Sequence, residues 1–306
     1  MRQNYLTINF LVALSCLLFS TLFDKASEGQ AKDMDAYNSF ADFCANKSKL
    51  DKETSHTVER LLLAAETSDC EIANKLLSNA TSIRLPKEGI SSLLPFKSLK
   101  KLVQLRLSEN QISDLTPLKS LTNLELLILD KNQITNISAL RFLTKLRYLS
   151  LEDNRLTNIN LLSALSNLEE LYLGRNKITA INSLSYLTNL TKVVLNNNQI
   201  IDIKPLERLI KVEELSISSN SISDISPLRN MKNLTFLSVK RNQISDIRHL
   251  KSLINLRQVF LSDNKITDIS SLISLKNLTN PLGLDVSRNQ IINKTCPFDD
   301  KEICSF

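Results

Sequence analysis

Leucine and isoleucine recur at fixed positions through most of the chain, in a unit 22 residues long. Around the first full unit, apolar residues stand five and three positions before Asn110 and two, five, eight and eleven positions after it. A period of this length indicates a solenoid, in which each unit buries its apolar face only against its neighbours. The asparagine column consists of Asn110, Asn132, Asn154, Asn176, Asn198, Asn220, Asn242 and Asn264, with Asn289 in a displaced last unit.

Two elements alternate within each unit. The residues from Gln104 to Ser108 alternate polar and apolar side chains, which is the pattern of a short strand with one buried face. After the asparagine the apolar spacing is three, and the stretch is too short for a full helical crossover, so we expect a tight 3₁₀-like return. The sequence therefore predicts an α/β solenoid, a curved rod with short parallel β-strands on its concave face.

The repeated asparagine has a structural explanation. A side-chain amide carries both a donor and an acceptor, so it can pair with the backbone groups that face inward where the chain leaves the strand. Carboxylates four positions further on could indicate acid–base or metal chemistry. Asn136, Asn158 and Ala180 share that column, however, and turn capping accounts for it better. The carboxylates are Asp114, Asp202, Asp224, Asp246 and Asp268.

Several segments match a known repeat. Asn220 to Leu228 (NSISDISPL) and Asn242 to Leu250 (NQISDIRHL), with linkers such as Leu121 to Leu124 (LTNL), resemble the 22-residue leucine-rich repeats of bacterial internalins. Repeats of this length also occur in the leucine-rich repeat regulatory subunit of phosphatase-1. With its cysteine-bearing N-terminal segment and its tail from Asn293 to Cys304 (NKTCPFDDKEIC), the chain looks most like exported leucine-rich repeat proteins of cyanobacteria. The internalin resemblance implies that the concave face is the ligand surface.

Both ends depart from the repeat, as the exposed ends of a stack require. We expect a signal peptide over 1–31, a helical N-terminal cap over 32–80, about ten repeats over 81–293 and a short disulfide-bearing C-terminal cap over 294–306. Within the first cap, Asp51 to Glu66 and Asp69 to Leu77 have helical apolar spacing, and Asp35 to Asn46 forms a weaker candidate helix. The first repeat has Glu88 and Gly89 in place of asparagine and its neighbour, and the last follows a three-residue slip around 280–282.

Cysteine positions support this division, because none lies in the regular repeats. The simplest pairing joins Cys44 with Cys70 and Cys296 with Cys304, one disulfide in each cap. The two other connectivities would require opposite ends of the rod to meet. A zinc site is the competing interpretation, but the two histidines, His56 and His249, are far apart.

Disulfides require an oxidising compartment, and the N-terminus has the pattern of an export signal. Arg2 precedes an apolar run from Ile8 to Phe23, and Gly29 and Ala31 offer a cleavage site before Lys32. Cleavage after Ala26 and retention as an anchor are the alternatives. We expect a secreted, periplasmic or cell-envelope protein with no stable membrane span after cleavage.

Composition argues against other classes of function. Four glycines and two histidines supply no phosphate-binding loop and no plausible catalytic triad, so we expect no enzyme activity, no cofactor and no metal. The net charge of +6 includes no run of lysine and arginine typical of nucleic-acid binding. With only four glycines and seven prolines, no flexible linker divides the chain.

The concave face is the candidate site. Strand residues six, four and two positions before each asparagine point away from the core, and most are polar. Apolar and aromatic exceptions on a rigid sheet are typical of protein interfaces, although scattered apolar side chains occur on any sheet face. The exceptions are Leu126, Ile128, Tyr148, Tyr172 and Val194 on successive strands, and Phe236 and Phe260 further along.

These observations favour a non-enzymatic, exported binding module that holds a protein on its concave face, with a glycan as an alternative ligand. One competing hypothesis is an intracellular scaffold that regulates a protein phosphatase. Free thiols and an uncleaved N-terminus would favour it. The other is a structural component of the cell envelope.

Overall fold

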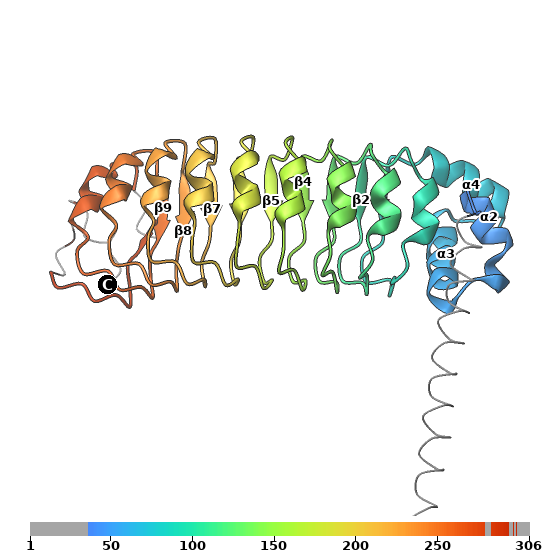
Figure 1. Ribbon diagram of the computed structural model, residues 1–306, viewed down its shortest axis with the longest axis horizontal. Helices are drawn as coiled ribbons and strands as arrows, with labels where there is room; N and C mark the ends of the chain where they lie inside the picture. Colours follow the sequence, from blue (N-terminus) through green and yellow to red (C-terminus); the bar gives the residue numbers. More distant parts are fainter. Residues whose placement is uncertain (1–35, 279–282, 294–295, 297, 299–306) are drawn as a thin grey trace, which may run out of the picture.

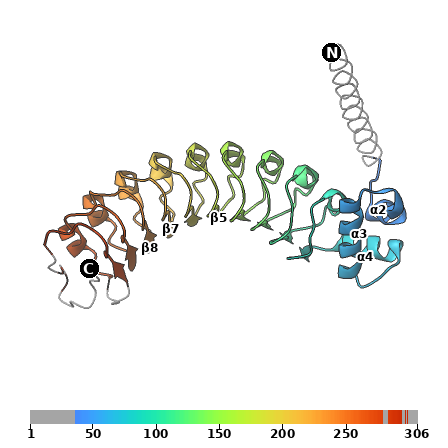
Figure 2. The same ribbon diagram turned by 90° about the horizontal axis from the view of Figure 1, so that it is seen from below.

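The computed structural model describes residues 36–278, 283–293, 296 and 298. They form a curved rod in which ten strands make one parallel sheet in chain order, from β1 to β10 (Figure 1). The strands line the inner side of the arc and the 3₁₀-helices its outer side (Figure 2). The predicted leucine-rich repeat solenoid, with its strands on the concave face, is confirmed.

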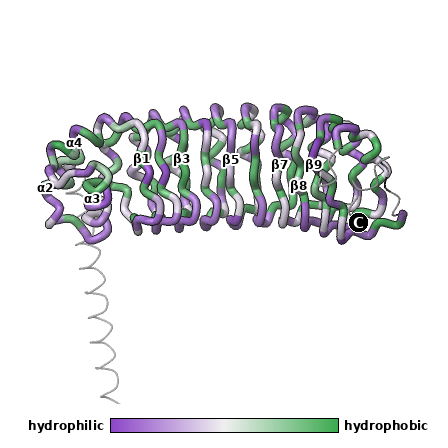
Figure 3. The backbone as a smooth tube through the Cα atoms, turned by 180° about the vertical axis from the view of Figure 1, so that it is seen from behind, coloured by the Kyte–Doolittle hydropathy of each residue, from purple (hydrophilic) through white to green (hydrophobic). Residues whose placement is uncertain are grey.

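Each strand spans only two or three residues, and in the three-residue strands the central side chain points into the core. Leu105 is fully buried between two half-buried neighbours, and Gln104 pairs with Leu126 one repeat later. Apolar stretches therefore recur at the same place in successive coils (Figure 3). The strands are β1 (Ser82–Arg84), β2 (Gln104–Arg106), β3 (Leu126–Ile128), β4 (Tyr148–Ser150), β5 (Glu170–Tyr172), β6 (Lys192–Val194), β7 (Glu214–Ser216), β8 (Phe236–Ser238), β9 (Gln258–Phe260) and β10 (Leu284–Asp285).

The returns on the convex side are five-residue 3₁₀-helices, as the apolar spacing of three predicts. Proline opens four of them, because its fixed φ suits the first helical positions. The carboxylate column caps these returns. Asp114 Oδ1, for instance, accepts the Thr116 N–H at 2.8 Å, which confirms turn capping. They are η2 (Leu94–Ser98), η3 (Thr116–Ser120), η4 (Ser138–Phe142), η5 (Asn160–Ala164), η6 (Asn182–Tyr186), η7 (Lys204–Arg208), η8 (Ser226–Asn230), η9 (Arg248–Ser252) and η10 (Ser270–Ser274).

The asparagine column joins adjacent coils through hydrogen bonds to the backbone. Asn132 Oδ1 accepts the Ile112 N–H at 3.0 Å, and its Nδ2 donates to the carbonyl oxygens of Leu107 and Leu129 at 3.0 Å each. One amide thus pairs backbone groups of its own coil and of the preceding coil. The same arrangement recurs from Asn110 to Asn264. At Asn289, Nδ2 reaches the Leu261 carbonyl 28 positions earlier instead of 25, so the ladder accommodates the three-residue slip.

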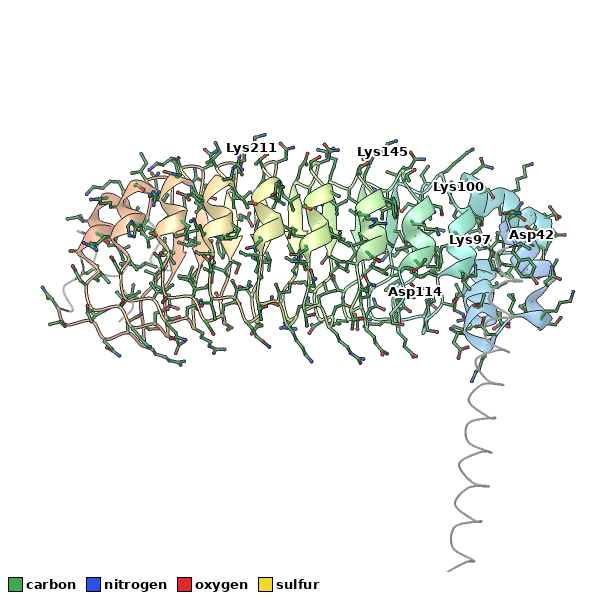
Figure 4. All side chains as sticks on the ribbon, viewed as in Figure 1. Asp42, Lys97, Lys100, Asp114, Lys145 and Lys211 are labelled. Atoms are coloured by element: carbon green, nitrogen blue, oxygen red, sulfur yellow. A yellow bond between two sulfur atoms is a disulfide. The ribbon has the colours of Figure 1, made fainter. Side chains whose placement is uncertain are left out.

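A second ladder, which sequence analysis did not identify, runs along one edge of the rod. Asn167 Nδ2 donates to the Thr144 carbonyl oxygen at 2.8 Å, and equivalent asparagines repeat the contact. Lysine replaces asparagine in some coils. Lys145 and Lys211, labelled on this edge in Figure 4, donate Nζ to the side-chain oxygens of Asn123 and Asn189 at 2.8 Å.

The residue just before each ladder asparagine has a left-handed backbone. Its φ is 59° at Glu109 and 55° at Ser219, and the column contains no glycine between Lys87 and Arg288. A side chain with a β-carbon is strained in this region. The returning chain imposes this conformation in every coil, because the ladder hydrogen bonds fix the turn.

We therefore expect Ser219→Gly to raise the free energy of unfolding by about 0.5 kcal/mol, since glycine removes the steric cost of the positive φ. Urea unfolding followed by circular dichroism measures the change. Ser221→Gly is the matched control. Ser221 is not among the positive-φ residues of the described chain, so glycine there should lower stability. An equal loss at both positions would contradict the prediction.

Three α-helices cover the N-terminal end. They are α2 (Phe40–Ala45), α3 (Lys52–Ala64) and α4 (Cys70–Asn79), with the short η1 (Lys47–Lys49) between the first two. Asp51 and Asp69 cap α3 and α4, close to the predicted starts. The helix expected from Asp35 begins only at Phe40, because Ser39 and Asp42 form a capping box that fixes its start.

The cap seals the first coil with polar contacts and with aromatic packing. His56 Nε2 lies 2.6 Å from the Glu88 carbonyl oxygen, at the place where later coils have a ladder asparagine. Gly89 follows with a φ of 67°, which favours glycine. Phe43 and Phe96 are fully buried, and the apolar core is continuous from the cap through the repeats.

The predicted Cys44 to Cys70 disulfide is present and joins α2 to α4, with Cα atoms 5.5 Å apart. Cys296 is buried, but its predicted partner Cys304 lies outside the described residues, as do residues 1–31. Within the described part of the chain, no helix is long and apolar enough to cross a membrane. The same residues include no group of three or more His, Cys, Asp and Glu side chains that could hold a metal ion.

Candidate binding site on the concave sheet

The register of the sheet decides which concave side chains become neighbours. Tyr148 stands beside Glu170, and Ser150 stands beside Tyr172, so residues six and four positions before the asparagines form two rows across the strands. A residue in one row lies diagonally next to the other row of the following strand, within reach of aromatic side chains. The seven apolar exceptions predicted from the sequence fall into two groups, on β3 to β6 and on β8 to β9.

The first group contains a packed tyrosine pair. The ring centroids of Tyr148 and Tyr172 lie 5.1 Å apart with a tilt of 32°. Tyr172 Oη donates a hydrogen bond of 2.6 Å to Glu170 Oε2. Leu126, Ile128 and Val194 are half-buried on the flanking strands. Mutual packing leaves all these side chains half-buried rather than fully exposed, with their outer faces open to solvent.

The second group is a phenylalanine pair. The ring centroids of Phe236 and Phe260 are 5.6 Å apart, and Lys240 Nζ lies 4.6 Å from the Phe260 centroid. The same ammonium group pairs with Asp285 at 2.9 Å. Ring, cation and carboxylate thus form one unit that spans β8 to β10.

Polar side chains separate the two groups. Lys192 on β6 pairs with Glu214 on β7 at 2.6 Å, and its Nζ lies 5.8 Å from the Tyr172 centroid. Ser216 continues the second row on β7. The concave face is therefore a sheet with two aromatic areas and a charged boundary between them.

Sequence analysis missed two carboxylates beside the tyrosine pair. Asp130 and Glu152 lie two positions before their ladder asparagines, just after β3 and β4. Burial raises the pKa of Tyr148, and the nearby charges of Glu170, Asp130 and Glu152 raise it further. Burial raises the pKa of Asp130, against hydrogen bonds from Ser150 and from the Glu152 N–H that lower it. Burial, followed by the negative charge of Asp130, raises the pKa of Glu152. Polar residues are expected at this position in every coil, so the two carboxylates do not stand out in the sequence. The one unusual residue in this column is Gly174, in the next coil.

Comparison with known proteins places the chain in a family. The family profile described as leucine-rich repeats in two copies matches residues 100–142, 144–186, 166–208 and 210–252. Internalin C2 from Listeria monocytogenes is 36% identical with a TM-score of 0.62, and the match covers 68% of this chain and 91% of that one. The chain belongs to the internalin-like leucine-rich repeat proteins.

Two further structures widen this comparison. The internalin InlF from Listeria monocytogenes is 29% identical with a TM-score of 0.52, over 77% of this internalin-like chain and 82% of its own. The ectodomain of the Arabidopsis thaliana receptor kinase GASSHO1/SCHENGEN3, solved in complex with Casparian strip integrity factor 2, is 26% identical with a TM-score of 0.57. That match covers 63% of this chain and 26% of the ectodomain chain. No curated protein matches the sequence.

Proposed function

We propose that this internalin-like protein is an exported, non-enzymatic binding module that holds a protein partner on its concave sheet. The two aromatic pairs, Tyr148 with Tyr172 and Phe236 with Phe260, carry this proposal. None of the four rings belongs to the buried columns that hold the coils together. Rigid aromatic side chains give a partner a large contact area at a low cost in conformational entropy.

Export is supported by two observations of different kinds. Residues 1–31 have the pattern of a cleavable signal peptide, with the helical cap at 32–80, the repeats at 81–293 and the second cap at 294–306 following it. The disulfide between Cys44 and Cys70 is typical of proteins that fold outside the reducing cytosol. The disulfide also argues against an intracellular phosphatase scaffold.

A protein ligand fits the face better than a glycan. Phe236 and Phe260 present apolar rings without hydroxyl groups, and such surfaces are buried most favourably by apolar side chains of a partner. The Arabidopsis receptor ectodomain, which shares the repeat fold, was solved with a bound factor. This likeness supports a protein partner without indicating which protein it is.

The proposal is tested by affinity capture from extracellular and envelope fractions of the native host. The wild-type chain is compared with a variant in which Tyr148, Tyr172, Phe236 and Phe260 are replaced by serine, under non-reducing conditions. We expect a partner that the wild type retains and the variant loses, because the variant lacks all four aromatic anchors.

A matched control removes four exposed apolar side chains from outside the concave rows. The variant carries serine at Phe142, Tyr186, Ile210 and Ile254, which are 44%, 64%, 56% and 58% exposed. It should capture the same partner as the wild type. Equal capture by the concave variant, or no capture by any form, would contradict the proposal and favour a structural role in the envelope.

A further inference from the structure

We propose that the partner segment crossing β3 to β5 is basic, and that one of its arginine or lysine side chains binds against Tyr148 between Asp130 and Glu152. This inference rests on the proposed function and specifies the chemistry of the partner. It follows from the charge of this part of the concave face, from an unusual glycine and from a comparison with the phenylalanine pair.

The two carboxylates lack a partner cation within the described residues. Glu152 takes part in no ion pair there, and neither does Asp130. The neighbouring cations are already engaged, since Arg175 pairs with Asp153 at 3.0 Å and Lys131 with Glu109 at 3.6 Å. Two half-buried negative charges just after adjacent strands repel each other. Burial is the larger cause of the raised pKa of Glu152, and the charge of Asp130 adds to it. A basic side chain from a partner would offset this repulsion.

The local fold does not require the negative charge of Asp130. Asp130 Oδ1 accepts hydrogen bonds from the Ser150 hydroxyl and from the Glu152 N–H at 2.9 Å. Three strands further along, the neutral amide of Asn196 accepts the equivalent pair, from the Ser216 hydroxyl at 2.9 Å and from the Ser218 N–H at 2.7 Å. An amide oxygen therefore accepts the same two hydrogen bonds, and the negative charge of Asp130 is not needed for them. The charge can instead contribute to binding a partner.

Gly174 gives the Glu152 carboxylate its position. Gly174 does not have the positive φ that demands glycine, as Gly89 does. A β-carbon built at Gly174 would instead meet Glu152 Oε1 at 2.7 Å, which is closer than real contacts allow. The missing side chain therefore makes room for the carboxylate on the concave surface. We see no other local reason for glycine at this position.

The phenylalanine pair shows the finished form of such an arrangement. There, Lys240 lies over the Phe260 ring and pairs with the Asp285 carboxylate, all within one chain. At the tyrosine pair, Lys192 lies over Tyr172 and pairs with Glu214 in the same way. The described residues place no cation over the other ring, Tyr148, on the side of Asp130 and Glu152. A partner's arginine or lysine would complete the same combination of cation–π contact and charge pairing.

Tyrosine fluorescence of the full chain can test this inference directly, because the protein has no tryptophan. Phenylalanine at Tyr5, Tyr37 and Tyr186 leaves Tyr148 and Tyr172 as the only reporters. The probes are the blocked tripeptides glycyl-arginyl-glycine and glycyl-lysyl-glycine, with glycyl-citrullyl-glycine as the neutral counterpart. We expect a saturable change with the cationic peptides that weakens at higher salt, and none with citrulline.

Charge-matched variants then locate the site. Asp130→Asn combined with Glu152→Gln should weaken binding of the arginine peptide about tenfold, as expected for the loss of a close charge pair. Gly174→Ala should weaken it too at unchanged net charge, because it displaces the carboxylate. Glu207→Gln, which removes one carboxylate from η7 on the convex side, is the control for Glu152→Gln and should change the affinity less than twofold.

The outcomes separate this inference from the proposed function. Equal binding of the arginine and citrulline peptides, equal binding by the neutralised variant, or no binding at all would overturn the basic-segment inference. Loss of the captured partner from the four-serine variant would still uphold concave docking in those cases. Conversely, unchanged capture by the four-serine variant would contradict the proposed function. Selective arginine binding would then show a site for basic side chains that the captured partner does not use.

Discussion

Replacing Asn176 by alanine is expected to lower the free energy of unfolding by about 4 kcal/mol. Asn176 Oδ1 accepts the Leu156 N–H at 2.9 Å, and Nδ2 donates to the Leu151 and Leu173 carbonyl oxygens at 2.9 and 3.1 Å. Alanine would leave these three backbone groups unpaired in the interior, at about 1 to 3 kcal/mol for each group that water cannot reach. The lost hydrogen bonds are those that join two adjacent coils.

Urea unfolding followed by circular dichroism measures the loss. Each coil contacts only its neighbours, so a weakened junction in the middle of the array should also broaden the transition as the two halves begin to unfold separately. Asn167→Ala is the matched control, because Asn167 makes one exposed hydrogen bond of 2.8 Å in the edge ladder. We expect it to cost less than about 1 kcal/mol. A similar loss at both asparagines would contradict the structural role of the buried ladder.

The two ladders show what the sequence could and could not predict. The buried ladder was predictable, because asparagine occupies its column without exception from Asn110 to Asn264 and the apolar columns around it fix the burial. The edge ladder was not, because lysine replaces asparagine at Lys101, Lys145 and Lys211. An amide and an ammonium group both donate hydrogen bonds, so the column conserves a physical property and not a residue type.

The candidate site also contains some residues that the sequence predicts and others that it does not. Tyr148 and Phe236 could be predicted, because an aromatic side chain outside the apolar columns is conspicuous. Asp130 and Glu152 could not, because polar residues are the norm on the concave face and their missing cations depend on side-chain geometry. The start of α2 was misplaced for a local reason, since the capping box at Ser39 competes with the helical spacing that begins at Asp35.

Leu171→Ala is expected to lower the free energy of unfolding by about 4 kcal/mol, whereas Tyr172→Ser in the same strand should cost about 1 kcal/mol. Leu171 is fully buried between the coils, so alanine would leave a cavity that the neighbouring strands, fixed by their ladder bonds, cannot close. Tyr172 is half-buried on the concave face, where its removal loses a ring contact of 5.1 Å and one hydrogen bond. Urea unfolding of both variants gives the two values.

Hydrogen exchange adds spatial resolution to this comparison. Leu171→Ala should speed amide exchange in β4 to β6, because those strands share the cavity, while Tyr172→Ser should leave their protection close to that of the wild type. This contrast bears on the binding proposal, since a four-serine variant is informative only if its strands remain intact. If Tyr172→Ser destabilised the sheet as much as Leu171→Ala, the tyrosine would belong to the core. Loss of a captured partner would then reflect a damaged fold and not a missing anchor.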